Sequence, residues 1–246
     1  GHSEDIVPCI RCLQCYHVST DHKNVQCSVN PRFNREKRVP LILPVTGHPK
    51  HLVIVGGGPA GITCALTASR RGHQVTLLEK EPVLTGKLNI ACHGEHKADL
   101  RRFRDYLLTQ LRKSSVTVHT GVLADTDVVR DLKPDALVIA VGATPSRIPL
   151  PGVDGDNCIQ ISEFLQSPDT SLQHYIIIGG GSVGCETALD LAEKGKDVSI
   201  IEMADCLASA SNDLYRLALS EHFARYDNLH TYLNSACQSI DADGVN

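Results

Sequence analysis

Four cysteines crowd into the first 27 residues, at the spacing Cys9-x-x-Cys12-x-x-Cys15 followed by Cys27. Three thiolates spaced three residues apart can cover one face of a metal cluster, and a distant fourth can close the ligand set. A zinc site with four thiolate ligands and a simple thiol pair are the alternatives, but such zinc sites usually use two separated C-x-x-C pairs. The spacing therefore favours a [4Fe–4S] cluster held by Cys9, Cys12, Cys15 and Cys27.

A glycine-rich turn near position 56 has the residue types that bind the pyrophosphate of a dinucleotide. The apolar run 52–55 suits a buried parallel strand, the pattern G-x-G-x-x-G follows at once, and a helical pattern begins after it. The first glycine permits a tight turn, the second lets a pyrophosphate approach the backbone, and the third lets the helix pack close to the strand. Free N–H groups and the positive end of the helix dipole then face the phosphates. The predicted contacts are Gly56, Gly58, Pro59, Ala60 and Gly61.

An acidic residue follows this turn at the position that a ribose requires. The predicted strand 74–78 is followed by Glu79, 18 residues after Gly61, and its carboxylate can accept hydrogen bonds from ribose hydroxyls. We include the adjoining Lys80 in the same predicted site. A glycine motif alone is weak, but strand, helix and trailing acid together make it specific.

The same pattern recurs 123 positions later without a gap in its register. A second G-x-G-x-x-G at 179–184 follows the apolar run 175–178, and Glu202 stands in the place of Glu79. A carboxylate there accepts from the 2′- and 3′-hydroxyls of NAD and repels the 2′-phosphate of NADP, and residues 203–207 include no arginine to bind that phosphate. NADH is therefore favoured over NADPH. The predicted contacts are Gly179, Gly181, Ser182, Val183, Gly184 and Glu202.

These elements predict an α/β fold of two tandem Rossmann-like dinucleotide-binding units, preceded by an irregular iron–sulfur segment. We predict a cysteine-rich segment and linker over 1–49, a first binding domain over 50–148, a crossover linker over 149–172 and an incomplete second binding domain over 173–246. A complete nicotinamide unit would have more strands, so truncation at the carboxyl end is expected, and the resemblance given below implies truncation at the amino end as well. The predicted strands are 52–55, 74–78, 116–119, 137–141, 175–178, 198–201, 229–233 and 237–240, and the predicted helices are 60–71, 97–113, 183–194 and 211–226.

Composition argues against several other classes of protein. The formal net charge is −4 and no dense Lys/Arg run occurs, so no nucleic-acid partner is predicted. No uninterrupted apolar stretch reaches about 18 residues, so neither a transmembrane helix nor a membrane partner is predicted. Ten cysteines without a secretory signal indicate a cytoplasmic protein whose cysteines are reduced or bind metal. Outside the cluster motif no C-x-x-C pair occurs, and Cys64 and Cys185 are expected to be small buried core residues.

The cysteine segment resembles that of a known family of oxidoreductases. Residues 5–15 read Asp-Ile-Val-Pro-Cys-Ile-Arg-Cys-Leu-Gln-Cys, and residues 27–31 read Cys-Ser-Val-Asn-Pro. Both look like the cluster segment of the multidomain old-yellow-enzyme family, which includes 2,4-dienoyl-CoA reductase, 2-enoate reductase and trimethylamine dehydrogenase. The order of cysteine segment, first glycine turn and second glycine turn matches along essentially the whole chain. By this resemblance the chain is the carboxy-terminal part of such an enzyme, without its FMN-containing TIM barrel.

The resemblance implies the cofactors and the reaction. NADH would bind the second unit and FAD the first, and electrons would pass through the [4Fe–4S] cluster to FMN in the barrel, which reduces an activated C=C bond of an enoate or enoyl substrate. The barrel is the implied partner, a homo-oligomer is compatible with the family, and no side chain of this chain is assigned as a catalytic acid or base. The alternative is a trimethylamine-dehydrogenase-like module whose first unit holds ADP and takes no part in hydride transfer. A glutamate-synthase small-subunit type ranks lower because its cysteine spacing is wider.

The resemblance also carries further site residues. Residues 84–88 resemble the flavin-contacting Leu-Gly-Gly-x-Leu of the family, although Thr85 replaces a glycine. Residues 137–145 resemble the Ala-Thr-Gly-x-x-Pro element at which related chains leave the flavin domain. Glu186, two residues after the last glycine of the second turn, is either a ligand of the nicotinamide carboxamide or an ordinary helix carboxylate. The residues added to the predicted site are Gly86, Lys87, Leu88, Ala140, Gly142 and Glu186.

Overall fold

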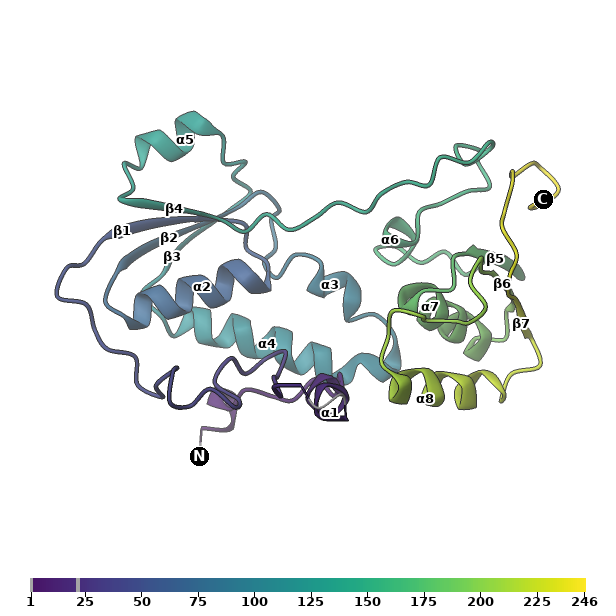
Figure 1. Ribbon diagram of the computed structural model, residues 1–246. Coiled ribbons are helices and arrows are strands. Elements are labelled where there is room, and N and C mark those ends of the chain that lie inside the picture. Colours follow the sequence, from purple (N-terminus) through teal and green to yellow (C-terminus); the bar gives the residue numbers. More distant parts are fainter. Residues whose placement is uncertain (1, 21–22) are drawn as a thin grey trace. The chain divides into compact units, whose positions relative to one another are not determined.

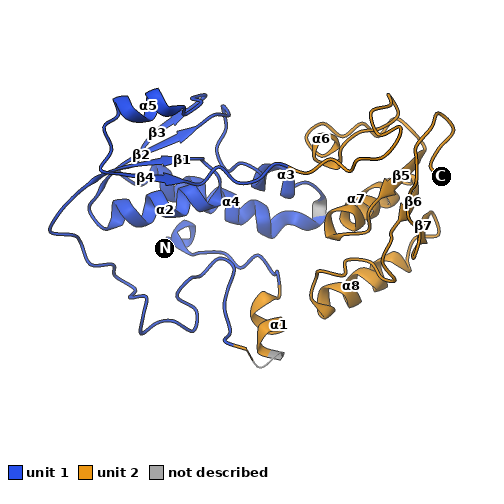
Figure 2. Ribbon diagram, turned by 45° about the horizontal axis from the view of Figure 1, so that its top comes forward, with its two compact units in different colours: residues 1–12, 24–144 blue, residues 13–23, 145–246 orange. Residues whose placement is uncertain are grey.

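The computed structural model describes residues 2–20 and 23–246. This part of the chain forms two compact units, which are coloured separately in Figure 2. Unit 1 contains residues 1–12 and 24–144, and unit 2 contains residues 13–23 and 145–246. Gly1, Asp21 and His22 of the predicted cysteine-rich segment lie outside the described residues. The domain boundaries given above remain predictions.

Unit 1 is built on a parallel sheet with the strand order β3-β2-β1-β4 (Figure 1). The strands are β1 (His51–Val55), β2 (Gln74–Glu79), β3 (Thr117–Thr120) and β4 (Ala136–Ile139). In the register of this sheet, Val53 lies beside Thr76 on β2 and beside Leu137 on β4. The chain order reverses between β1 and β4, and in open α/β sheets ligands bind at the carboxyl ends of the strands at such a point.

Helices α2 (Pro59–Arg70) and α4 (Ala98–Arg112) lie on one face of this sheet, and α5 (Thr126–Asp131) lies beyond the other (Figure 1). Short turns of helix, η1 (Ser3–Asp5), α3 (Leu88–Ala91) and η2 (Glu95–Lys97), complete the unit. Full burial of an aliphatic side chain contributes about 1.5–3 kcal/mol, so the core between sheet and helices holds this unit together. That core contains Ile54, Ile62, Ala65, Leu66, Val75, Leu77, Leu107 and Leu111.

Unit 2 has the same alternation of parallel strands and helices as the first part of unit 1. Strands β5 (His174–Ile178), β6 (Asp197–Ile201) and β7 (Leu229–Tyr232) form a parallel sheet in the order β5-β6-β7. Helices α7 (Ser182–Glu193) and α8 (Asp213–Phe223) follow the first and second of these strands. The side chain of Asn212 caps α8 by accepting a hydrogen bond from Tyr215 N at 2.9 Å, as expected for an asparagine at this position. The core of unit 2 contains Phe164, Cys185, Ala188, Leu189, Leu191, Val198, Ile200 and Leu219.

The main helices and strands lie within about three residues of their predicted ends, with one exception. The predicted strand 237–240 is wrong: it contributes only an isolated antiparallel bridge between Ile240 and Val245. The carboxylate of Asp241 accepts from the N–H groups of Asp243 and Gly244, which turns the chain back on itself. Ile240 N then donates to Pro151 O at 2.8 Å, so this segment pairs with the linker and not with the sheet.

Within residues 2–20 and 23–246, four short α-helices were not predicted from the sequence. They are α1 (Gln14–Thr20), within the stretch expected to be irregular, α6 (Ile161–Phe164), within the predicted linker, and α3 and α5 of unit 1. They contain seven, four, four and six residues, so none of them leaves a clear repeat of apolar positions. Across the described part of the chain, no helix has both the length and the apolar character needed to cross a membrane.

Candidate functional site

The first glycine turn is shaped by two glycines and left open at the third. A Cβ atom on Gly56, which has φ +108°, would lie 2.3 Å from Ala140 O, and one on Gly61 would lie 1.8 Å from Gly56 O. Side chains at these two positions would therefore collide with backbone. A Cβ on Gly58 would meet no atom within 4 Å. The space in front of Gly58 is what a pyrophosphate needs, so the turn fits a dinucleotide.

Glu79 lies at the carboxyl end of β2 and is clamped to the turn. Its buried carboxylate accepts from Gly57 N at 2.6 Å through Oε2 and from Glu81 N at 2.9 Å through Oε1. Two carboxylate oxygens offer about four acceptor positions, so both can still receive ribose hydroxyls. Lys80 does not join this arrangement, because its side chain is exposed and lies 3.6 Å from Glu81. The role of Lys80 in cofactor binding stays a prediction.

The loop 84–88 lies directly against the turn. Thr85 N donates to Gly57 O at 2.7 Å, and a Cβ on Gly86 would lie 3.4 Å from Gly58 Cα. Thr85 is fully buried with φ +77°, a left-handed conformation that glycine adopts without steric cost, which explains why a glycine fits the family pattern here. Leu88 begins α3 and packs against the core, while Lys87 is exposed.

Residues after β4 also reach the turn. Ala140 N donates to Val55 O at 2.7 Å, and the Ala140 carbonyl forms the wall next to Gly56. Gly142 has φ +73° and is exposed, with no atom within 4 Å of a Cβ at that position. The structure therefore brings Ala140 into the turn and leaves Gly142 two residues beyond it.

The second glycine turn has the same geometry in unit 2. Gly179 has φ +104°, a Cβ on Gly184 would lie 2.2 Å from Gly179 O, and one on Gly181 would meet nothing within 4 Å. Glu202 accepts from Gly180 N at 2.6 Å and from Ala204 N at 2.7 Å. Ser182 and Val183 open helix α7, as Pro59 and Ala60 open α2.

The correspondence between the two turns extends further than the sequence pattern. Ala208 N donates to Gly180 O at 2.7 Å, as Thr85 N does to Gly57 O. Ala208 is also buried and left-handed, with φ +49°. Sequence reasoning missed this pair because threonine and alanine share no motif. Their separation is the same 123 residues that relates the glycines, and that fixed offset was the available signal.

Glu186 on α7 has a partner that sequence reasoning also missed. Tyr215 Oη donates to Glu186 Oε1 at 2.9 Å across the space between α7 and α8. Burial, and then the neighbouring carboxylate, raise the pKa of Tyr215, so the phenol keeps its proton and acts as donor. This contact holds one Glu186 oxygen in place. Binding of a nicotinamide carboxamide by Glu186 remains a prediction.

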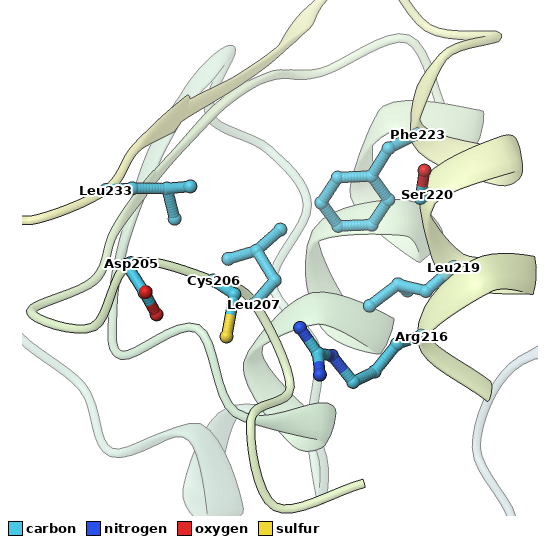
Figure 3. A pocket seen from close by; sticks show the side chains of 8 residues that line it. All are labelled: Asp205, Cys206, Leu207, Arg216, Leu219, Ser220, Phe223 and Leu233. Atoms are coloured by element: carbon cyan, nitrogen blue, oxygen red, sulfur yellow. The ribbon is translucent and has the colours of Figure 1, made fainter. Parts of the chain in front are cut away.

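A pocket of about 240 Å³ lies between α8 and the loop that follows Glu202 (Figure 3). Arg216 projects from α8 toward this loop, whose own residues 203–207 include no arginine. The other α8 residues that line the pocket lie three, four and seven positions after Arg216, which places all of them on one face of the helix. This spacing is the feature of the sequence that could have located Arg216 beside the pocket. The lining is Asp205, Cys206, Leu207, Arg216, Leu219, Ser220, Phe223 and Leu233.

The predicted cluster ligands are accessible thiols. Cys9, Cys12 and Cys15 are exposed, Cys27 is half-buried, and the described part of the chain contains no disulfide. Cys9, Cys12 and Cys27 belong to unit 1, whereas Cys15 lies on α1 and belongs to unit 2.

Contacts inside unit 1 support the chemistry of this donor set. Cys12 Sγ lies 3.3 Å from Ser28 Oγ, so the chain at Cys27 runs beside the C-x-x-C segment. Arg11 N donates to Cys9 Sγ at 3.4 Å. Exposed thiols such as Cys9 and Cys12 fit the role of iron–sulfur ligands, and the cluster itself stays a prediction.

Cys185 is a core residue whose thiol should make the free energy of unfolding depend on pH. Burial raises the pKa of its thiol from 9.0 to about 12, and Sγ donates to Gly180 O at 3.2 Å. Because the folded pKa lies above the unfolded value, the contribution of this thiol to stability is complete below about pH 8.5 and falls as the pH rises toward the folded pKa. We expect the free energy of unfolding, measured with denaturant, to decline above about pH 9 and to decline less steeply in Cys185→Ala. An equal decline in both proteins would contradict this prediction.

Comparison with known proteins places this arrangement in a family. Residues 50–246 match the model of the family described as pyridine nucleotide-disulphide oxidoreductase. The chain is 35% identical over 92% of its length to an NADH oxidase of Thermoanaerobacter brockii, covering 35% of that protein. It is 32% identical over 86% of its length to a cinnamate reductase of Clostridium sporogenes, covering 31% of it.

A solved structure gives the same result. The complex of 2-naphthoyl-CoA reductase with 2-naphthoyl-CoA superposes with a TM-score of 0.92 and 28% identity, over 98% of this chain and 37% of that one. The chain thus spans about a third of the length of these relatives. The predicted resemblance and the α/β fold class are confirmed. The chain belongs to the pyridine nucleotide-disulphide oxidoreductase family.

Proposed function

We propose that this chain is the electron-transfer module of a larger NADH-dependent flavin oxidoreductase. Unit 1 binds FAD, unit 2 binds NADH, and Cys9, Cys12, Cys15 and Cys27 hold a [4Fe–4S] cluster. An FMN-containing barrel elsewhere in the parent chain receives the electrons and reduces an activated C=C bond of an enoate or enoyl substrate. The names of the cinnamate and naphthoyl-CoA reductases, which act on conjugated acids or thioesters, support this substrate class.

The main support for the proposal is that the glycine turn with its bound glutamate occurs twice, once in each unit. Each unit has an open glycine, a helix beginning beside it, and a glutamate bonded to the turn at 2.6 Å. Two such sites in one chain suit a donor and an acceptor dinucleotide. A module with a purely structural ADP would need the first site and would leave the second without a purpose.

The contribution of the protein itself is placement. When bound, FAD would accept a hydride from NADH and pass its electrons on singly. Gly58 and Gly181 leave room for the pyrophosphates, and the first N–H groups of α2 and α7 face them. Glu186, held by Tyr215, is available to orient the carboxamide of the nicotinamide.

A reconstitution experiment tests the proposal. The purified protein is incubated without oxygen with FAD, ferrous iron and sulfide, desalted, and analysed for flavin, iron and visible absorbance. We expect about one FAD and about four iron atoms per chain. Protein that keeps ADP but takes up no flavin would support the structural alternative and refute the proposal.

Removal of the Glu202 carboxylate should change the choice of nicotinamide cofactor. In Glu202→Ala the ribose hydroxyls lose a charged acceptor, a loss of about 1.5–3 kcal/mol, so the Kd of NADH should rise about tenfold or more. NADPH should lose much less, because the repulsion of its 2′-phosphate disappears as well. Both Kd values are measured by titration of the isolated chain.

Glu79→Ala is the matched control for this prediction, because it removes the equivalent clamp from unit 1. It should weaken FAD retention and leave the Kd of NADH unchanged. An unaltered ratio of NADH to NADPH affinity in Glu202→Ala would show that Glu202 does not select the cofactor.

A further inference from the structure

A buried carboxylate joins the cysteine segment to helix α4. Asp99, in the first turn of α4, has a side chain that is only 6% exposed, and its two oxygens accept from two guanidinium groups. One belongs to Arg11, which lies between Cys9 and Cys12, and the other belongs to Arg102 on α4 itself. Hydrogen bonds between charged groups are the strong ones. Asp99 therefore anchors the cysteine loop at the amino-terminal end of α4.

A second set of contacts ties the start of the chain to the other end of α4. Asp5 accepts from Gln110 Nε2 at 2.8 Å and from Lys113 Nζ at 2.7 Å, and Glu4 accepts from Lys113 Nζ at 3.0 Å. Within the described residues, the one group of three potential metal ligands within 4.8 Å of each other is His2, Glu4 and Asp5. Lys113 already pairs with both carboxylates, so we assign the group to the contact with α4 and no ion to it.

The segment between these two ends runs antiparallel to α4. From Asp99 to Lys113 the helical path is about 21 Å, at a rise of 1.5 Å per residue. From Asp5 to Arg11 an extended chain covers about 20 Å, at roughly 3.3 Å per residue. The two lengths agree, and residues 7–13 have no regular secondary structure. Figure 1 shows this N-terminal segment, in purple, beside α4.

We propose that this double attachment fixes the cysteine loop on unit 1 before any cluster is bound. We call it the α4 clasp: Arg11 with Asp99 at one end, and Asp5 with Gln110 and Lys113 at the other. Arg11 and Asp99 are thus positioning residues for the cluster, an inference that rests on the proposed function. The clasp itself is a property of the metal-free chain.

The physical reason is the cost of ordering a loop. The C-x-x-C segment has no helix or strand to hold it, and every ordered residue loses conformational entropy. Arg11 also has φ +49°, a conformation that side-chain-bearing residues rarely adopt, so a contact outside the loop is needed to maintain it. A loop that is ordered beforehand binds its ligand more tightly, since that entropy is already lost.

The first test needs no cluster. In the metal-free protein, Arg11→Gln should lower the backbone NMR order parameters of Val7 and Ile10 from roughly 0.85, typical of rigid backbone, to below about 0.6. Arg102→Gln removes a guanidinium from the same carboxylate without releasing the loop, and should leave these values unchanged. The two arginine side chains are 72% and 67% exposed, so both variants should fold. Unchanged order parameters in Arg11→Gln would overturn the clasp.

The second test uses protein loaded with iron and sulfide. Arg11→Gln should release iron to a chelator about tenfold faster than the unaltered protein, the equivalent of one charge-assisted hydrogen bond. Arg102→Gln should release it at the unaltered rate, and equal rates in all three proteins would overturn the positioning role. If the unaltered protein takes up no iron, the proposed cluster and the positioning role fail together. The order parameters then still decide whether the clasp exists.

Discussion

Alanine at Gly61 should disrupt unit 1, whereas alanine at Gly58 should leave the unit folded and remove its dinucleotide. A Cβ at position 61 would lie 1.8 Å from the carbonyl oxygen of Gly56, and both partners belong to the backbone of the turn. Overpacking of this kind costs about 3 kcal/mol, which outweighs the gain of about 1 kcal/mol in helix propensity. A melting temperature lower by about 10 °C is expected for a unit of this size.

Gly58→Ala is the matched control within the same turn. Gly58 caps α2 with φ −76°, which any residue can adopt, and its Cβ would meet no protein atom within 4 Å. Stability should therefore change by no more than about 1 kcal/mol, while the added methyl group occupies the path of the pyrophosphate. The measurements are thermal unfolding and FAD retained after desalting. A Gly58→Ala protein that binds FAD normally would contradict the assigned role of the open glycine.

Unit 2 provides an independent copy of the same experiment. Gly184→Ala brings a Cβ to 2.2 Å from Gly179 O, whereas Gly181→Ala meets nothing within 4 Å. The first should destabilise unit 2, and the second should abolish NADH binding while FAD stays bound in unit 1. Loss of FAD in Gly181→Ala would show that the two sites are not separate.

Serine in place of Cys12 should eliminate the cluster and leave both dinucleotide sites intact. Cys12 is the middle cysteine of the C-x-x-C-x-x-C segment and a predicted ligand, and a hydroxyl is a poor substitute for a thiolate in an iron–sulfur site. Iron and sulfide content after reconstitution should fall to the background, and the broad cluster absorbance should be lost. FAD uptake should be unchanged, because the turn of unit 1 is held by its own strand, with Gly57 N donating to Glu79 and Gly56 N donating to Leu78 O.

Cys158→Ser serves as the control for this substitution. Cys158 is half-buried in the predicted linker 149–172 and does not belong to the cluster motif. Its Sγ lies 3.6 Å from Gly152 O. It should retain the iron content of the unaltered protein. Full iron content in Cys12→Ser would refute the cluster assignment, because the assignment rests on a cysteine spacing that includes Cys12.

The parts of the fold that follow from local pattern could be predicted from the sequence. Buried β-branched runs ending in glycine located β1 and β5, and the residues Glu79 and Glu202 came out at the ends of the following strands. Asn212 caps α8, and asparagine is one of the residue types that favour this position. Hydrophobic periodicity, turn-forming residues and helix caps depend on residues that are close in the sequence, so they can be recognised without the structure.

The contacts that organise the sites are not local and could not be predicted in this way. Arg11 reaches Asp99 across 88 residues, and Tyr215 reaches Glu186 across 29. Each pair needs two helices or loops to pack in a particular way before the partners meet. The wrongly predicted strand 237–240 has the same cause, because its apolar residues alone do not reveal that Ile240 pairs with the linker at Pro151.

In the proposed function, NADH bound to unit 2 reduces FAD bound to unit 1, and an anaerobic titration measures this transfer. The FAD-loaded protein is titrated with NADH while its visible spectrum is recorded, and Gly181→Ala is titrated in parallel. The proposed function predicts that about one equivalent of NADH bleaches the flavin bands of the unaltered protein and that Gly181→Ala keeps its oxidised spectrum. Flavin bands that survive excess NADH in the unaltered protein would show that this hydride transfer does not occur.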